Sequence, residues 1–156
     1  MLFAESIRQV LLLAHGLATF ALVGCAGLVL AAGISEMRGG DRWGRRRALL
    51  GNLLIGAYAV TFLTGIWLYP YFRVEVRAAC LDPNFPVFTG LFEIKEHWLA
   101  MGLGLLLAHR TLATGAVTGR PRALVAILVG TIVLVTTVIG VAIVAGDLAL
   151  CSQVPP

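Results

Sequence analysis

Charge is scarce in this sequence. Only 13% of the 156 residues are charged, whereas 59% are hydrophobic. A water-soluble domain of this length has a small core and does not need so large an apolar fraction, so we expect the surplus apolar surface to face lipid. The net charge of +4 comes mostly from arginines in short segments beside apolar runs. It therefore predicts membrane topology, not binding to nucleic acid.

Several motifs that would identify an activity are missing. The three cysteines form no Cys-x-x-Cys pair, which excludes the membrane thiol oxidases that use such a pair beside a quinone. The chain has no phosphate-binding loop, no nucleophile elbow and no Ser-His-Asp order. Its apolar runs lack the dense acidic or basic residues of an ion or proton path. We therefore expect neither catalysis nor transport from this chain on its own.

Long apolar runs are the dominant feature that is present. Crossing a hydrocarbon core of roughly 30 Å takes about 20 helical residues. The runs lack the alternation of barrel strands, and backbone in lipid must be hydrogen-bonded within its own segment. The sequence predicts one all-α domain over residues 1–156, an integral membrane four-helix bundle, with helices at about 10–34, 48–69, 92–113 and 123–146.

The cations predict how this bundle is oriented. Of the 12 basic residues, eight follow the first or third span: Arg38, Arg42, Arg45, Arg46, Arg47, Arg110, Arg120 and Arg122. The positive-inside rule places these turns in the cytoplasm and both termini outside. The 11 arginines against one lysine, with abundant Ala, Gly, Leu and Val, suggest a high-GC bacterium. We expect a multi-pass protein of the bacterial inner (plasma) membrane, whose partners are the lipid bilayer and other membrane subunits.

A long extracytoplasmic loop is expected between helices 2 and 3, from Pro70 to Glu96. A connection of this length usually has a function or a fixed shape of its own. Residues 72–77 alternate apolar and charged side chains, which predicts a segment lying on the bilayer or an extended cap over the bundle. Cys80 in this loop and Cys151 in the tail would share an oxidising compartment, so we expect a disulfide between them. Cys25 lies within the first span and is expected to pack as a small apolar residue.

The histidines are the best remaining indication of function, because an ionisable side chain inside a bilayer is a functional hypothesis by default. His15 and His97 both fall in the outer half of the predicted bundle. Two histidines on different helices can ligate a b-type haem, with Arg73 close to its propionates, or they can bind a quinone. Their depths match only if the third helix extends well beyond the headgroups or is tilted. His109, beside Arg110, is expected to be interfacial.

Three interpretations therefore remain open. The first is a small non-catalytic subunit or anchor of an electron-transfer assembly, with His15, His97 and Arg73 around haem b or a quinone. The second is a structural or interaction module without a cofactor, clamped by its disulfide. The third is an outer-face metal site on Glu93, Glu96 and His97, with a further ligand from Asp82, Asp147 or His15. Glycines recur in the spans, which predicts close helix packing, or space for a flat cofactor or a lipid tail.

Overall fold

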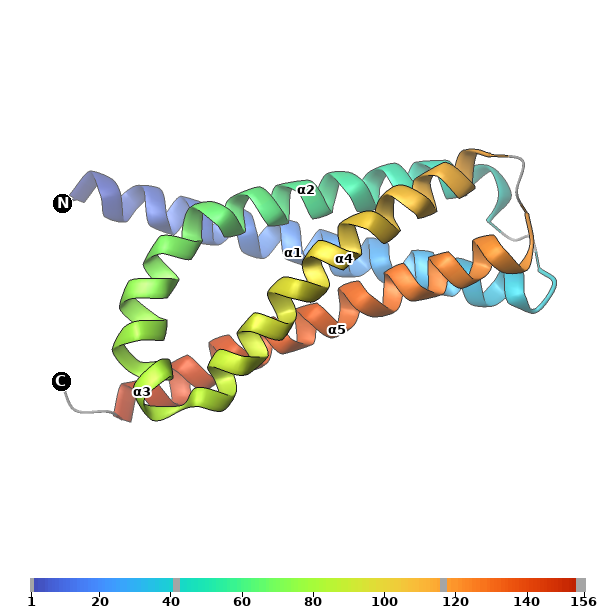
Figure 1. Cartoon of the computed structure of the whole chain (residues 1–156). Helices are drawn as coiled ribbons and strands as arrows, with labels where there is room; N and C mark the ends of the chain where they lie inside the picture. Colours follow the sequence, from blue (N-terminus) through green and yellow to red (C-terminus); the bar gives the residue numbers. More distant parts are fainter. Residues whose placement is uncertain (1, 41–42, 116–117, 154–156) are drawn as a thin grey trace.

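The structure is a computed structural model that describes residues 2–40, 43–115 and 118–153, and the regular secondary structure of these residues is entirely helical. Four long helices form a bundle, which confirms the predicted all-α four-helix fold (Figure 1): α1 (Leu2–Met37), α2 (Arg47–Tyr71), α4 (Pro86–Thr114) and α5 (Arg120–Leu150). Both chain termini lie at one end of the bundle, here called the terminal end (Figure 1). The α1–α2 and α4–α5 turns lie at the other, here called the arginine end.

The helices are arranged so that α1 and α4 lie on a diagonal. α1 packs against α2 and α5, and α4 packs against α5 and more sparsely against α2. Among the described residues, no Cα atom of α1 lies within 8 Å of a Cα atom of α4. A glycine permits the closest approach of α1 and α5, because a Cβ at Gly130 would lie only 2.7 Å from Leu30 Cβ. This contact is of the kind that small residues allow between membrane helices, which have no hydrophobic drive to associate in lipid.

The bundle surface is largely apolar. Its central core consists of small and branched side chains from α1, α2 and α5 with Leu106 of α4. Large hydrophobic side chains also face outward, such as Phe20 at 83% and Trp67 at 70% exposure. Three helical stretches are long and apolar enough to cross a membrane: Ser6–Met37, Arg47–Asn84 and Arg120–Gln153. These features suggest a multi-pass membrane protein. α4 lies alongside them but carries more polar residues.

The connection between α2 and α4 is helical, whereas the sequence predicted a loop with a surface-lying or extended cap. α2 continues into η2 (Phe72–Leu81), a run of wider π-helical turns, and then into the short α3 (Asp82–Asn84). The chain bends after Pro70, which cannot donate a backbone hydrogen bond and disturbs the preceding turn. η2 crosses the terminal end of the bundle from α2 towards α4 and α5 (Figure 1). The alternation in residues 72–77 therefore does not mark an extended segment, and this half of the prediction was wrong.

Candidate functional site

A disulfide closes the cap at the terminal end. Cys80, at the end of η2, is bonded to Cys151 in η3 (Cys151–Gln153), the short 3₁₀ turn that follows α5, and the two Cα atoms are 5.9 Å apart. This confirms the predicted pair. Beneath the disulfide lies a cluster around Leu81, Phe92 and Ile143, in which the rings of Phe72 and Phe92 stack at 4.6 Å between centroids. The disulfide and the cluster together hold η2 against α4 and α5.

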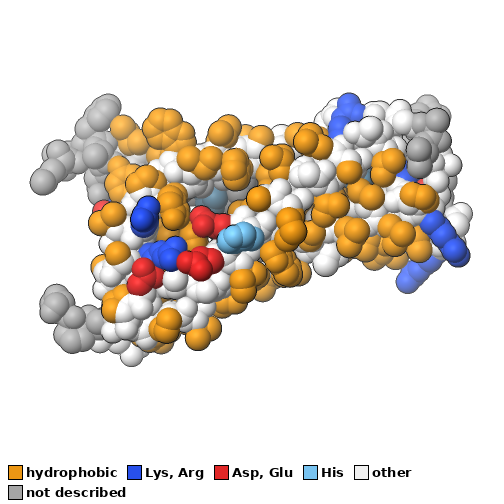
Figure 2. Space-filling model, viewed as in Figure 1, with side chains coloured by type: hydrophobic (Ala, Val, Ile, Leu, Met, Phe, Trp, Pro, Cys, Tyr) orange, Lys and Arg blue, Asp and Glu red, His pale blue; other side chains and the backbone are white. Residues whose placement is uncertain are grey.

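Ion pairs tie the same cap to its neighbours. Arg77 of η2 donates to Asp82 Oδ1 at 3.1 Å and to Glu93 Oε1 of α4 at 2.7 Å, and the hydroxyl of Thr89 donates to Asp82 Oδ1 at 2.7 Å. Arg8 of α1 pairs with Glu75 of η2 at 2.7 Å. Acidic side chains accordingly gather at the terminal end of the face drawn in Figure 2, beyond a belt of hydrophobic ones.

His15 is the predicted site residue with the most specific surroundings. Its half-buried imidazole lies between α1 and α2, with Nδ1 3.1 Å from the backbone oxygen of Thr61 and 3.0 Å from Oγ1 of Thr64. A carbonyl oxygen can only accept, so Nδ1 carries the hydrogen. Thr64 directs its own hydroxyl hydrogen to Val60, at 2.7 Å, and can therefore accept as well. In the neutral ring Nε2 is left with a lone pair and makes no hydrogen bond with any described residue.

Lys95 of α4 supplies a cation inside the same half of the bundle. Its side chain crosses Gly140 of α5, where an added Cβ would lie 3.5 Å from Lys95 Cε. Its Nζ is 5.2 Å from the centre of the Phe92 ring, and its charge acts electrostatically on His15. No carboxylate of a described residue forms an ion pair with it. The distribution of cations along the sequence groups this lysine with Arg8, Arg73 and Arg77 on the predicted outer surface, whereas the structure turns its side chain towards α5.

One further polar atom joins this group. Oγ1 of Thr61 is buried without a hydrogen-bond partner among the described residues. What we call the polar cluster comprises His15 of α1 with Thr61 and Thr64 of α2, together with Lys95 of α4, which lies against Gly140 of α5 and acts on His15 electrostatically. It combines a lone-pair nitrogen, a hydroxyl and an ammonium in an interior that is otherwise mainly aliphatic. Such a set can bind a molecule that has both carbonyl and hydroxyl groups, or ligate a metal through Nε2.

The structure does not bring His97 and Arg73 into this cluster. α4 does begin at Pro86, so it extends outward as a match in depth requires. His97 is nevertheless exposed, and its Nδ1 lies 2.7 Å from the backbone oxygen of Glu93 in its own helix. No described Cα atom of its helix lies within 8 Å of a Cα atom of α1, the helix that carries His15. Arg73 is exposed on η2.

The proposed metal ligands are also spread apart. Within 2–40, 43–115 and 118–153, no group of three or more His, Cys, Asp and Glu side chains is placed to hold a metal ion. Glu93 binds Arg77 instead, and His97 binds its own backbone. Of these side chains, Glu93 therefore helps to fix the cap on α4.

A buried ion-pair network at the arginine end was missed by sequence reasoning, which treated these charges only as topology signals. Glu36, near the end of α1, accepts from Arg47 of α2 at 2.5 Å. It also accepts from Arg122 of α5 at 2.5 Å and from the backbone N–H of Gly119 at 3.0 Å. Gly119 has a φ of +81° and is the N-cap of α5, so Glu36 supplies the acceptor that this helix start otherwise lacks. One carboxylate thus joins three helices.

Comparison with known proteins gives no relative from which a function could be transferred. The chain matches no protein-family model, no curated protein and no solved structure. The functional argument therefore depends on the polar cluster itself.

Proposed function

We propose that this chain is a small membrane subunit or anchor of an electron-transfer assembly and that it holds a redox cofactor beside His15. In this proposal all four long helices cross the membrane. The terminal end is extracytoplasmic and the arginine end is cytoplasmic, as the distribution of cations favours. The membrane is a bacterial inner membrane. The chain contributes a cofactor site to its partners and has no catalytic activity of its own.

The observation that carries the proposal is the fixed tautomer of His15. A hydrogen bond from Nδ1 to a backbone carbonyl is a common way to orient an imidazole whose Nε2 ligates a metal or accepts a proton. Placing this ring, Lys95 and the Thr61 hydroxyl inside a membrane bundle is costly unless they serve a ligand. Gly65 and Gly140 make room for these two side chains, since an added Cβ would lie 3.3 Å from His15 Cε1 or 3.5 Å from Lys95 Cε.

Of the two cofactors, the geometry favours a quinone over a b-type haem. A quinone offers two carbonyl oxygens, which can accept from Lys95 and from the Thr61 hydroxyl. Its reduced form offers hydroxyl groups, which can donate to Nε2 of His15. A haem with two histidine ligands would instead require the His97 side chain to break its hydrogen bond to Glu93 of the same helix and to turn towards the interior. The remaining haem arrangement has His15 as its sole histidine ligand, with Lys95 beside a propionate.

Cofactor analysis of purified protein tests the proposal. The protein is expressed in a host that supplies haem and quinone, purified in mild detergent, and examined by absorbance and by organic extraction with chromatography. We expect bound quinone in near-stoichiometric amount, lost in His15→Leu and retained in the matched control His97→Leu. A Soret band that disappears in His15→Leu would support the haem form. Wild-type protein that carries neither cofactor would overturn the proposal.

The disulfide-clamped cap favours a second candidate, a structural or interaction module without a cofactor. η2 presents exposed side chains at the terminal end, including Arg73 and Val74, on a segment held by Cys80 and Cys151. This candidate predicts that His15→Ala and His97→Ala leave any complex intact, whereas Cys80→Ser or Cys151→Ser releases the partner. Co-purification of the partner with each variant distinguishes the two candidates.

A further inference from the structure

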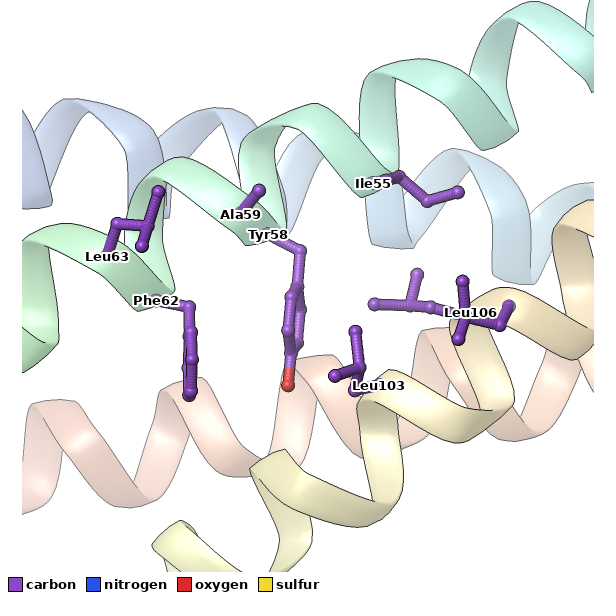
Figure 3. Close-up of a pocket in the computed structure, with 8 residues that line it drawn as sticks. Ile55, Tyr58, Ala59, Phe62, Leu63, Leu103 and Leu106 are labelled. Carbon is purple, nitrogen blue, oxygen red and sulfur yellow. The ribbon is translucent and has the colours of Figure 1, made fainter.

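An apolar groove of about 200 Å³ lies between α2 and α4, away from the polar cluster. Figure 3 shows that side chains of both helices face this space; its lining residues are Ile55, Tyr58, Ala59, Phe62, Leu63, Leu103, Leu106 and Leu107. The rings of Tyr58 and Phe62 stack nearly parallel, and the Tyr58 hydroxyl donates to the backbone oxygen of Leu99. With that hydroxyl bonded to the protein, the groove offers hydrocarbon surface.

Two basic residues lie at the arginine end of this groove. Gly51 is one helical turn before Ile55 on α2, and on α4 His109 and Arg110 follow the lining residues Leu106 and Leu107 by about one turn. A Cβ at Gly51 would lie 3.8 Å from His109 Nε2 and 3.9 Å from Arg110 Cδ. The ring of His109 and the stem of Arg110 therefore pack against α2 at Gly51.

The polar atoms at this position lack partners within the described chain. His109 is 95% buried, at 5% exposure, and neither of its ring nitrogens has a hydrogen-bond partner among the described residues. This corrects the expectation that His109 is interfacial. The guanidinium of Arg110 likewise forms no hydrogen bond or ion pair with any described residue. A neutral imidazole always has one N–H and one lone pair, so leaving both unpaired in a buried site is unfavourable.

We infer that this groove and its basic end form a binding site for one anionic phospholipid. An acyl chain occupies the apolar groove between α2 and α4. The phosphate lies at the arginine end, where it accepts from the guanidinium of Arg110. A basic pocket between membrane helices with hydrocarbon surface directly next to it is the arrangement that recognises anionic headgroups. The inference does not depend on the proposed redox function.

Native mass spectrometry of the full chain in detergent tests this site. Phosphatidylglycerol and phosphatidylcholine with identical acyl chains are titrated separately, so that only the headgroup charge differs. We expect wild-type protein to bind one phosphatidylglycerol at least about fivefold more tightly than phosphatidylcholine. Arg110→Gln removes this preference, whereas Arg110→Lys keeps it. The matched control Arg120→Gln, which removes an exposed arginine at the same end of the bundle, leaves it unchanged.

A second pair of variants tests the acyl chain. Ala59→Phe fills the groove and is expected to lower phosphatidylglycerol binding, whereas Leu53→Phe on an exposed position outside the groove is not. Equal binding of the two lipids by wild-type protein, or equal effects of Arg110→Gln and Arg120→Gln, would overturn the inference. So would inorganic phosphate competing fully with the lipid at equal concentration, because the groove would then contribute nothing.

Discussion

The carboxylate of Glu36 provides the sharpest test of how the bundle is held together. We predict that Glu36→Gln lowers the free energy of unfolding by about 3 kcal/mol. The side chains of Glu36, Arg47 and Arg122 are only 10%, 8% and 15% exposed. Removing one charge from a buried pair typically costs about 3–5 kcal/mol, because the opposite charge stays behind without compensation. The lower value applies because glutamine keeps an oxygen that can accept from the N–H of Gly119.

A matched surface pair provides the control. Glu75 binds Arg8 at 2.7 Å, but its side chain is 54% exposed and that of Arg8 is 30% exposed. An exposed ion pair contributes about 0–1 kcal/mol, so Glu75→Gln is expected to cost less than about 1 kcal/mol. Both variants lose one carboxylate near an end of the bundle, and they differ in the burial of the pair that is broken.

Reversible unfolding in mixed detergent micelles measures the difference. Tryptophan fluorescence reports the transition at increasing fractions of dodecyl sulfate, and the shift in midpoint gives the change in free energy. In the double variant Glu36→Gln with Arg122→Gln, part of the loss should be recovered, because the second change removes a charge that lost its partner. A Glu36→Gln variant no less stable than Glu75→Gln would refute the assignment of this network as the main polar link between α1, α2 and α5.

Three further predictions concern the disulfide, the helix packing and the polar cluster. Cys151→Ser should lower the free energy of unfolding by about 4 kcal/mol in the chain-entropy model, because the disulfide spans 71 residues. Cys25→Ser should leave the free energy of unfolding unchanged, and unfolding with and without reductant measures both effects. Gly130→Ala forces α1 and α5 apart and should cost about 1–3 kcal/mol, whereas Gly56→Ala, with nothing within 4 Å, should stay within about 1 kcal/mol in the same titration. Lys95→Met should stabilise the cofactor-free protein against heat by removing an unpaired interior charge, and should abolish quinone retention; destabilisation would contradict the placement of Lys95.

The number and approximate positions of the long helices could be predicted because lipid imposes a strong constraint on sequence. An apolar stretch of about 20 residues that crosses a bilayer must be helical, because its backbone has no other hydrogen-bond partners there. Apolar length therefore located α1, α2 and α5, whereas α4 has a shorter apolar run and also required the helix-forming residues at 92–96. The Cys80 and Cys151 pair followed from the same topology. Apolar length does not predict where a helix ends once it continues into polar residues. α1 and α4 both extend beyond their apolar runs, at Leu2–Met37 and Pro86–Thr114, because hydrogen bonding within the backbone continues without lipid.

The Glu36 network illustrates a second limit. Arg47 and Arg122 are 11 and 86 residues from Glu36 along the chain, and each of the three side chains is unremarkable near a basic turn. Only the packing of α1 beside both α2 and α5 brings Arg47 and Arg122 to one carboxylate. The pairing of helices was not specified by composition, since every span has small residues that could allow close contact.

Only part of the polar cluster could be identified from the sequence. His15 was selected because it is ionisable within an apolar run, but Lys95 was counted as surface charge. On α4 the inward positions recur at intervals of three and four residues: Phe92, Lys95, Leu99, Gly102, Leu106 and His109. Once any two of them are known to be buried, helical periodicity requires the others to face the same way. The sequence could not choose this face because α4 has apolar residues all round. In the structure, Lys95 and His109, whose two ring nitrogens have no described partner, lie on the same inward face of α4.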